Sequence, residues 1–133
     1  MKLPGRQLAI TPLLLAACLG SGAMDAKAAT LSDLKRGVYV ADVVGCTGVG
    51  GAGEMTFDGK NFSGHYQVCR TDPIAGQPGQ FQSTCSEGQG SHWPTQAQID
   101  ADPDKTTATV TLKVTSAQSF IMDHDSYRFC APL

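Results

Sequence analysis

The sequence GEMTFDGKNFSGHYQVCR, residues 53–70, predicts a β-hairpin. Two short runs of β-type residues flank the tetrapeptide DGKN (58–61), whose residue types favour a tight turn. On each arm the apolar residues share one parity, so each arm can turn an apolar face toward a common core. These residues are Met55 and Phe57 on the first arm and Phe62, Tyr66 and Val68 on the second. The hairpin therefore predicts a fold built from antiparallel strands.

Further strand patterns follow along the chain, and the clearest is the run 106–115. Its apolar residues alternate with threonine and lysine, which is typical of a strand with one face in water. Shorter strands are expected at 38–44, 80–85, 119–122 and 127–130. A helical turn capped by Thr30 is expected before the first strand. The sequence therefore predicts a mainly β domain, a small antiparallel barrel or sandwich of six to eight strands with a short N-terminal helical turn.

The cysteines predict two disulfides in a compartment outside the cytosol. If Cys18 belongs to the export signal, an even set remains in the mature chain: Cys46, Cys69, Cys85 and Cys130. Four cysteines allow three connectivities. We prefer Cys69 with Cys85, which ties neighbouring strands, and Cys46 with Cys130, which ties the first strand to the last. Because aromatic residues are few, two bridges would supply a large part of the stability.

Residues 1–28 have the pattern of an export signal, and residues 29–133 are expected to form a single β domain. Two processing sites compete. The residues before Cys18 match a bacterial lipobox, so that Cys18 is a lipidation candidate, whereas the A-x-A pattern ending at Ala28 would give ordinary cleavage. The expected location is the periplasm, with anchoring to the outer membrane if Cys18 is lipidated, or secretion as the alternative.

Charge and motifs argue against nucleic acid, metal and cofactor. Loss of Lys2 and Arg6 with the signal changes the formal net charge from −2 to −4, and no basic cluster remains. The segment 48–53 matches G-x-G-x-x-G, but no helix is expected after it, as dinucleotide binding requires. The acidic run 100–104 lacks the glycine of a calcium loop. We therefore expect no cofactor, and contact with a membrane only through a lipid on Cys18.

Loop residues supply the candidate binding surface. Trp93, beside His92 in the long connection 86–105, is an aromatic anchor for a partner or, alternatively, a lid that folds onto the core. Ser63, His65 and Tyr66 lie near the end of the hairpin. Scattered His and Asp residues, such as those of the run 123–125, also allow a small secreted enzyme, but no catalytic motif supports it.

The segment Ser63-Gly64-His65-Tyr66 resembles the inhibitory segment of the bacterial periplasmic and lipid-anchored inhibitors of c-type lysozyme. The resemblance extends to an export signal, about one hundred residues and cysteines near the first and last strands. The Trp-rich second segment of that family has only Trp93 as its counterpart. The leading expectation is a non-catalytic envelope protein that binds a protein or small ligand through loops at one barrel end. The alternatives are a lysozyme or hydrolase inhibitor and, third, a small enzyme.

Overall fold

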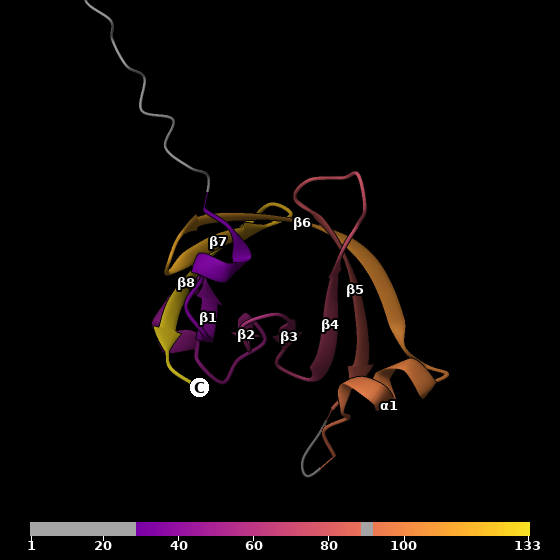
Figure 1. The fold of residues 1–133 in the computed structure, drawn as a ribbon. Coiled ribbons are helices and arrows are strands. Elements are labelled where there is room, and N and C mark those ends of the chain that lie inside the picture. The colour runs from indigo at the N-terminus through magenta and orange to yellow at the C-terminus, as the bar shows by residue number, and fades with distance from the viewer. Residues whose placement is uncertain (1–28, 89–91) are drawn as a thin grey trace, which may run out of the picture.

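The structure is a computed structural model that describes residues 29–88 and 92–133. It contains eight strands, two 3₁₀ turns and one α-helix. In chain order these are η1 (Leu31–Asp33), β1 (Gly37–Ala41), η2 (Cys46–Gly48), β2 (Glu54–Phe57), β3 (Phe62–Gly64), β4 (Gln67–Pro73), β5 (Gln80–Glu87), α1 (Gln96–Ala101), β6 (Thr106–Ser116), β7 (Ser119–Met122) and β8 (Asp125–Ala131). The strands form one antiparallel sheet in the order β3-β2-β1-β8-β7-β6-β5-β4, which curls until β3 lies beside β4 (Figure 1). The prediction of a small antiparallel β-barrel is confirmed.

The predicted export signal, with Cys18 and Ala28, lies outside the described residues. Within the described residues, no helix has both the length and the apolar character needed to cross a membrane. At the start of the described chain, Thr30 and Asp33 cap each other across η1, because Asp33 Oδ2 accepts hydrogen bonds from the Thr30 N–H and hydroxyl. The predicted N-terminal helical turn is therefore a single 3₁₀ turn.

The predicted hairpin forms, but its second arm is shorter than expected. The Asp58 carboxylate accepts hydrogen bonds from the N–H groups of Lys60 and Asn61 and so holds the turn between β2 and β3. The arm then breaks after Gly64, and the chain turns at His65 before β4 begins. Tyr66 is consequently 59% exposed, so its predicted place on the core face is wrong.

The first strand also ends earlier than the sequence predicts. β1 stops at Ala41, and Val43 lies almost fully in solvent. The chain turns here because the N–H groups of Val44 and Gly45 both donate to the Ala41 carbonyl, and Gly45 has a φ of 73° that favours glycine. The run of β-branched residues therefore extends beyond the strand that it predicts.

The long strand β6 joins two parts of the sheet. Its first half, up to Thr111, pairs with β5, and its second half, from Leu112, pairs with β7. Figure 1 shows β6 curving over the top of the barrel between these partners. The predicted alternation is confirmed as a strand, and Leu112 is its most buried residue.

Side chains close the barrel between β3 and β4, and we call this boundary the seam. Thr71 Oγ1 accepts a hydrogen bond from the Phe62 N–H at 3.1 Å, and Asn61 Oδ1 accepts one from the Thr71 N–H at 3.0 Å. Ser63 Oγ accepts one from the Cys69 N–H at 3.0 Å. The described β3 and β4 share no ladder register, so these contacts take the place of main-chain pairing.

Aromatic rings form the centre of the core. Tyr39 and Phe120 are fully buried with ring centroids 5.1 Å apart, and the ring centroid of Phe62 lies 4.8 Å from that of Phe120. The Tyr39 hydroxyl donates to the Lys35 carbonyl, and burial raises the pKa of Tyr39 to about 12. Several of the few aromatic residues of the chain thus pack together in the core, where burial contributes most.

Both predicted disulfides are confirmed. Cys69 and Cys85 stand opposite each other on β4 and β5, and Cys46 bridges from the β1–β2 connection to Cys130 on β8. Such bridges indicate an oxidising location outside the cytoplasm.

Candidate functional site

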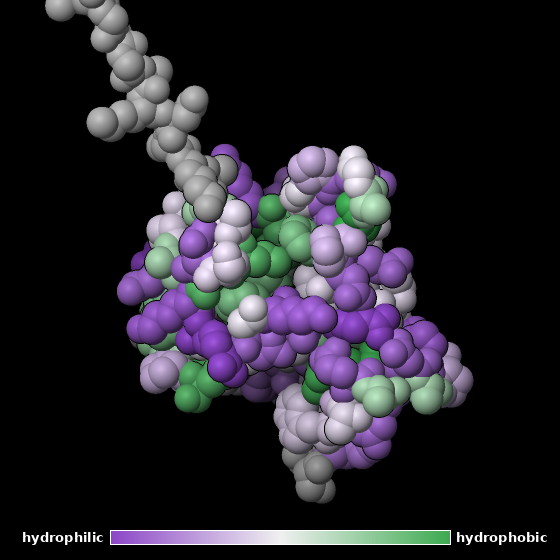
Figure 2. All heavy atoms as spheres, viewed as in Figure 1, coloured by the Kyte–Doolittle hydropathy of each residue, from purple (hydrophilic) through white to green (hydrophobic). Residues whose placement is uncertain are grey.

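The main candidate site is an apolar pocket of about 730 Å³ at the end of the barrel where the described chain begins. Figure 2 shows apolar residues gathered in a hollow on this face, just below the point where the described chain starts. The pocket lies between the N-terminal turn, the β4–β5 turn and the second half of β6. Its lining residues are Ala29, Thr30, Leu31, Pro78, Gly79, Phe81, Leu112, Lys113, Val114 and Thr115. We call it the end pocket.

The end pocket exists because β6 continues to Ser116, beyond Thr111, where its pairing with β5 ends. The ladder between these strands ends at Thr111, and the Leu112 N–H still donates to the Gly79 carbonyl at 2.8 Å. Before Gly79 the chain folds into the β4–β5 turn, where the Gln80 N–H donates to the Gln77 carbonyl at 3.0 Å. No described strand continues along this edge of β6, so a space remains between β6 and η1.

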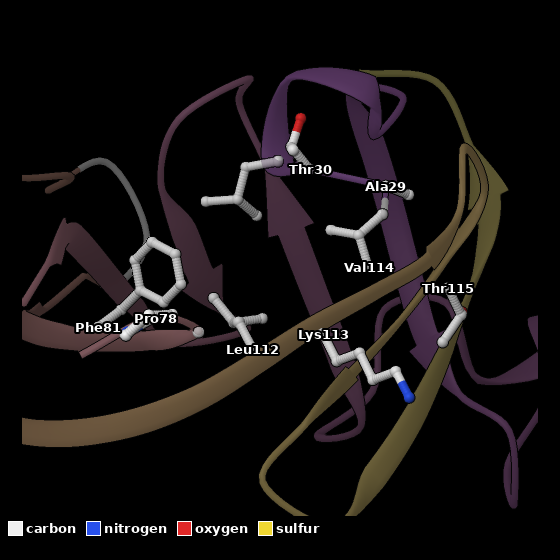
Figure 3. Close-up of a pocket in the computed structure, with 10 residues that line it drawn as sticks. Ala29, Thr30, Pro78, Phe81, Leu112, Lys113, Val114 and Thr115 are labelled. Atoms are coloured by element: carbon white, nitrogen blue, oxygen red, sulfur yellow. The ribbon is translucent and has the colours of Figure 1, made fainter. Parts of the chain in front are cut away.

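The inner wall of the end pocket is apolar. Figure 3 shows that Phe81, Leu112 and Val114 extend into the space, whereas Lys113 and Thr115 extend to the other side of β6. Lys113 and Thr115 therefore border the pocket mainly through their main chain. A cavity of this size with apolar side chains is typical of small-ligand sites, which usually measure about 300–1,000 Å³.

The predicted binding residues lie mostly at the opposite end of the barrel. At one end of the β4–β5 ladder Gln67 pairs with Glu87, and Tyr66 is the residue before Gln67. At the other end Pro73 pairs with Phe81, which lines the end pocket. Ser63 stays inside the seam, half-buried, with its hydroxyl bonded to the Cys69 N–H.

Tyr66 and Trp93 come close together through Gly88. The Gly88 N–H donates to the Tyr66 carbonyl at 3.0 Å, and a Cβ added at Gly88 would lie 2.6 Å from Trp93 Cε3. The His65 ring meets the Tyr66 ring edge-on at 4.2 Å, while Trp93 is 51% exposed and His92 is also exposed. We call His65, Tyr66, His92 and Trp93 the aromatic end.

Polar residues outside these two ends form no candidate site of their own among the described residues. Asp123, in the β7–β8 turn, has a φ of 54° and accepts a hydrogen bond from the Thr111 N–H at 2.8 Å. A polar hollow of about 390 Å³ lies beside Gln67, Glu87 and Asp102. Across residues 29–88 and 92–133, no group of three or more His, Cys, Asp or Glu residues could hold a metal ion.

Comparisons with protein-family models, with curated proteins and with solved structures find no match. The end pocket was missed by sequence reasoning because its walls come from three segments far apart in the chain. One signal pointed to it: the alternating run 106–115 is longer than the predicted strands beside it. A strand that is longer than its neighbours has main-chain N–H and C=O groups that no neighbouring strand pairs with.

Proposed function

We propose that the protein is an exported, non-catalytic binding barrel that holds a small apolar ligand in the end pocket. The observation that carries the proposal is the apolar wall formed by Phe81, Leu112 and Val114 in a cavity of about 730 Å³. We propose the periplasm as its location, with Cys18 as a lipid anchor. Cleavage after Ala28 would instead give a soluble periplasmic or secreted protein.

The size and lining of the pocket favour an alkyl chain as ligand. Each buried methylene group contributes about 0.8 kcal/mol, so a chain of eight methylene groups would contribute about 6 kcal/mol. This free energy corresponds to a dissociation constant of the order of 10⁻⁵ M. Binding of this strength is measurable and reversible, as a carrier or sensor of apolar molecules requires.

The test is titration with the uncharged fluorescent probe N-phenyl-1-naphthylamine, whose emission rises in apolar surroundings. Val114→Phe fills the pocket and should weaken binding by about tenfold or more. Thr109→Phe is the matched control, because it adds the same ring to the exposed face of β6. Equal binding by wild type and both variants, with all three folded by circular dichroism, would exclude the end pocket as the site.

A second candidate function is inhibition of a c-type lysozyme by the aromatic end. The observation that favours it is the exposed turn after Ser63-Gly64, where Tyr66 stands in solvent with the His65 ring against it. Such a turn offers a rigid aromatic contact to a protein cleft. The lysozyme assay given in the Discussion tests it.

A further inference from the structure

In the wall of the end pocket, Val114 on β6 presents a main-chain N–H and C=O that no other described residue pairs with. On β6, the Leu112 N–H donates to the Gly79 carbonyl, just before β5, while the Thr111 carbonyl accepts from the Asp123 N–H, just after β7. In an antiparallel strand these directions alternate, so the N–H and C=O of Val114 also point to the β5 side. There the chain has already turned away. Within the described parts of the chain, neither group of Val114 has a hydrogen-bond partner.

We propose that the ligand of the end pocket is a linear acyl amide, in which an alkyl chain is joined to a secondary amide. The alkyl chain would lie against Phe81 and Leu112. The amide C=O would accept from the Val114 N–H, and the amide N–H would donate to the Val114 C=O. This inference rests on the proposed function and names the chemical class of its ligand.

A single amide fits this edge better than an extended peptide does. The register between β6 and β7 shifts between Val114 and Ser116, so the regular alternation of main-chain directions in β6 is interrupted immediately after Val114. An added peptide strand takes its affinity from several successive main-chain pairs. Val114 offers one donor and one acceptor before this irregularity, and a secondary amide supplies the one acceptor and one donor that complete them.

The charges around the pocket favour a neutral polar group on the ligand. Lys113 is the charged residue among the ten lining residues, and its side chain extends to the other side of β6 (Figure 3). In the form that begins at Cys18, a carboxylate held beside Val114 would therefore be desolvated without a cation to pair with it. An amide carries no charge and can pair with both the N–H and the C=O of Val114.

The same chemistry has a second source in the chain itself. An acylated amino group on Cys18 would be an alkyl amide, and Ala29 at the pocket rim lies eleven residues after Cys18. Eleven residues span at most about 40 Å, which is enough to reach back to the pocket. We assign the pocket to a free molecule, because drawing the acylated amino group of Cys18 into the barrel would also pull the lipid on the thiol of the same residue away from the bilayer.

Isothermal titration calorimetry on the full chain, exported and processed by the expressing cell, tests the inference. The probes are N-methyldecanamide, N,N-dimethyldecanamide and methyl decanoate, which share the alkyl chain but differ in the amide N–H. We expect N-methyldecanamide to bind about fivefold to tenfold more tightly than the other two. In ¹⁵N-labelled protein, the Val114 amide proton should move downfield when N-methyldecanamide binds.

The variants and the remaining outcomes separate the inference from the proposed function. Val114→Pro removes the N–H at an edge where proline is tolerated, so the affinity ratio between the amide and the ester should fall toward one. Equal affinity of the wild type for all three probes would overturn the amide and keep the apolar site. No binding of any probe, by the wild type or by Cys18→Ser, would overturn both.

Two further results would also overturn the assignment to a free acyl amide. One is tighter binding of a short extended peptide, acetyl-Ala-Leu-Ala N-methylamide, than of N-methyldecanamide. The other is binding of the probes by Cys18→Ser combined with no binding by the acylated wild type, which would show that the anchor itself fills the pocket.

Discussion

The seam predicts that Thr71→Val destabilises the barrel. Thr71 is 3% exposed and Phe62 is 2% exposed, and Thr71 Oγ1 accepts the hydrogen bond from the Phe62 N–H at 3.1 Å. Valine has nearly the same shape as threonine but has no acceptor. In the variant the Phe62 N–H would remain buried without a partner.

The expected cost follows from that unpaired donor. A buried polar group that loses its partner costs about 1–3 kcal/mol. For a domain of about one hundred residues, each kcal/mol lowers the melting temperature by about 4–8 °C. We therefore expect Thr71→Val to lower the free energy of unfolding by about 2 kcal/mol and the melting temperature by roughly 10 °C.

Urea and thermal unfolding followed by circular dichroism measure the effect, with the disulfides intact. Thr109→Val is the control, because it makes the same chemical change on the exposed face of β6, where substitutions usually change stability by less than about 0.5 kcal/mol. If Thr71→Val were as stable as Thr109→Val, side-chain closure of the barrel would be refuted.

Three other predictions concern the bridges, the β2–β3 turn and the aromatic end. Replacing Cys46 and Cys130 with alanine should cost about 4.5 kcal/mol in urea unfolding, against about 3 kcal/mol for the shorter Cys69 bridge, because the longer loop restricts the unfolded chain more. Burial raises the pKa of Asp58, but the hydrogen bonds from Asn61 and Lys60 together lower it by more. The pKa of Asp58 therefore lies below its ordinary value. Stability from Asp58 is thus present above about pH 4 and lost as the pH falls below it, and Asp58→Asn should remove this part of the acid sensitivity in urea titrations. If the aromatic end inhibits a c-type lysozyme, near-stoichiometric protein should slow cell-wall lysis and Tyr66→Ala should weaken inhibition by about tenfold or more, whereas an unchanged lysis rate would exclude this function.

Much of the fold could be predicted from local patterns. The alternation in 106–115 specifies a strand whatever its neighbours are, and an even set of mature cysteines specifies paired thiols. The pairing of Cys69 with Cys85 followed from short strands that must lie side by side. The strand signal is strong because it depends on nearby residues alone, and the cysteine signal is strong because it depends only on an even count.

The site could not be predicted in the same way. Tyr66 has the parity of a core residue, but the chain breaks after Gly64, and parity has no meaning across a turn. The end pocket depends on where β5 begins relative to β6, which is a matter of register between distant segments. The sequence did mark His65 and Trp93 as candidates, and the structure brings them to one end of the barrel.

The positions of the two bridges have a consequence for how the molecule would fail. One bridge joins β4 to β5, and the other joins the β1–β2 connection to β8, so neither crosses from β3 to β4. β3 and β4 can therefore separate along the seam while both disulfides stay intact. Separation would expose β3 and β4 as two edge strands, each able to pair with a strand of a second molecule. Self-association would then begin from a protein with both disulfides formed.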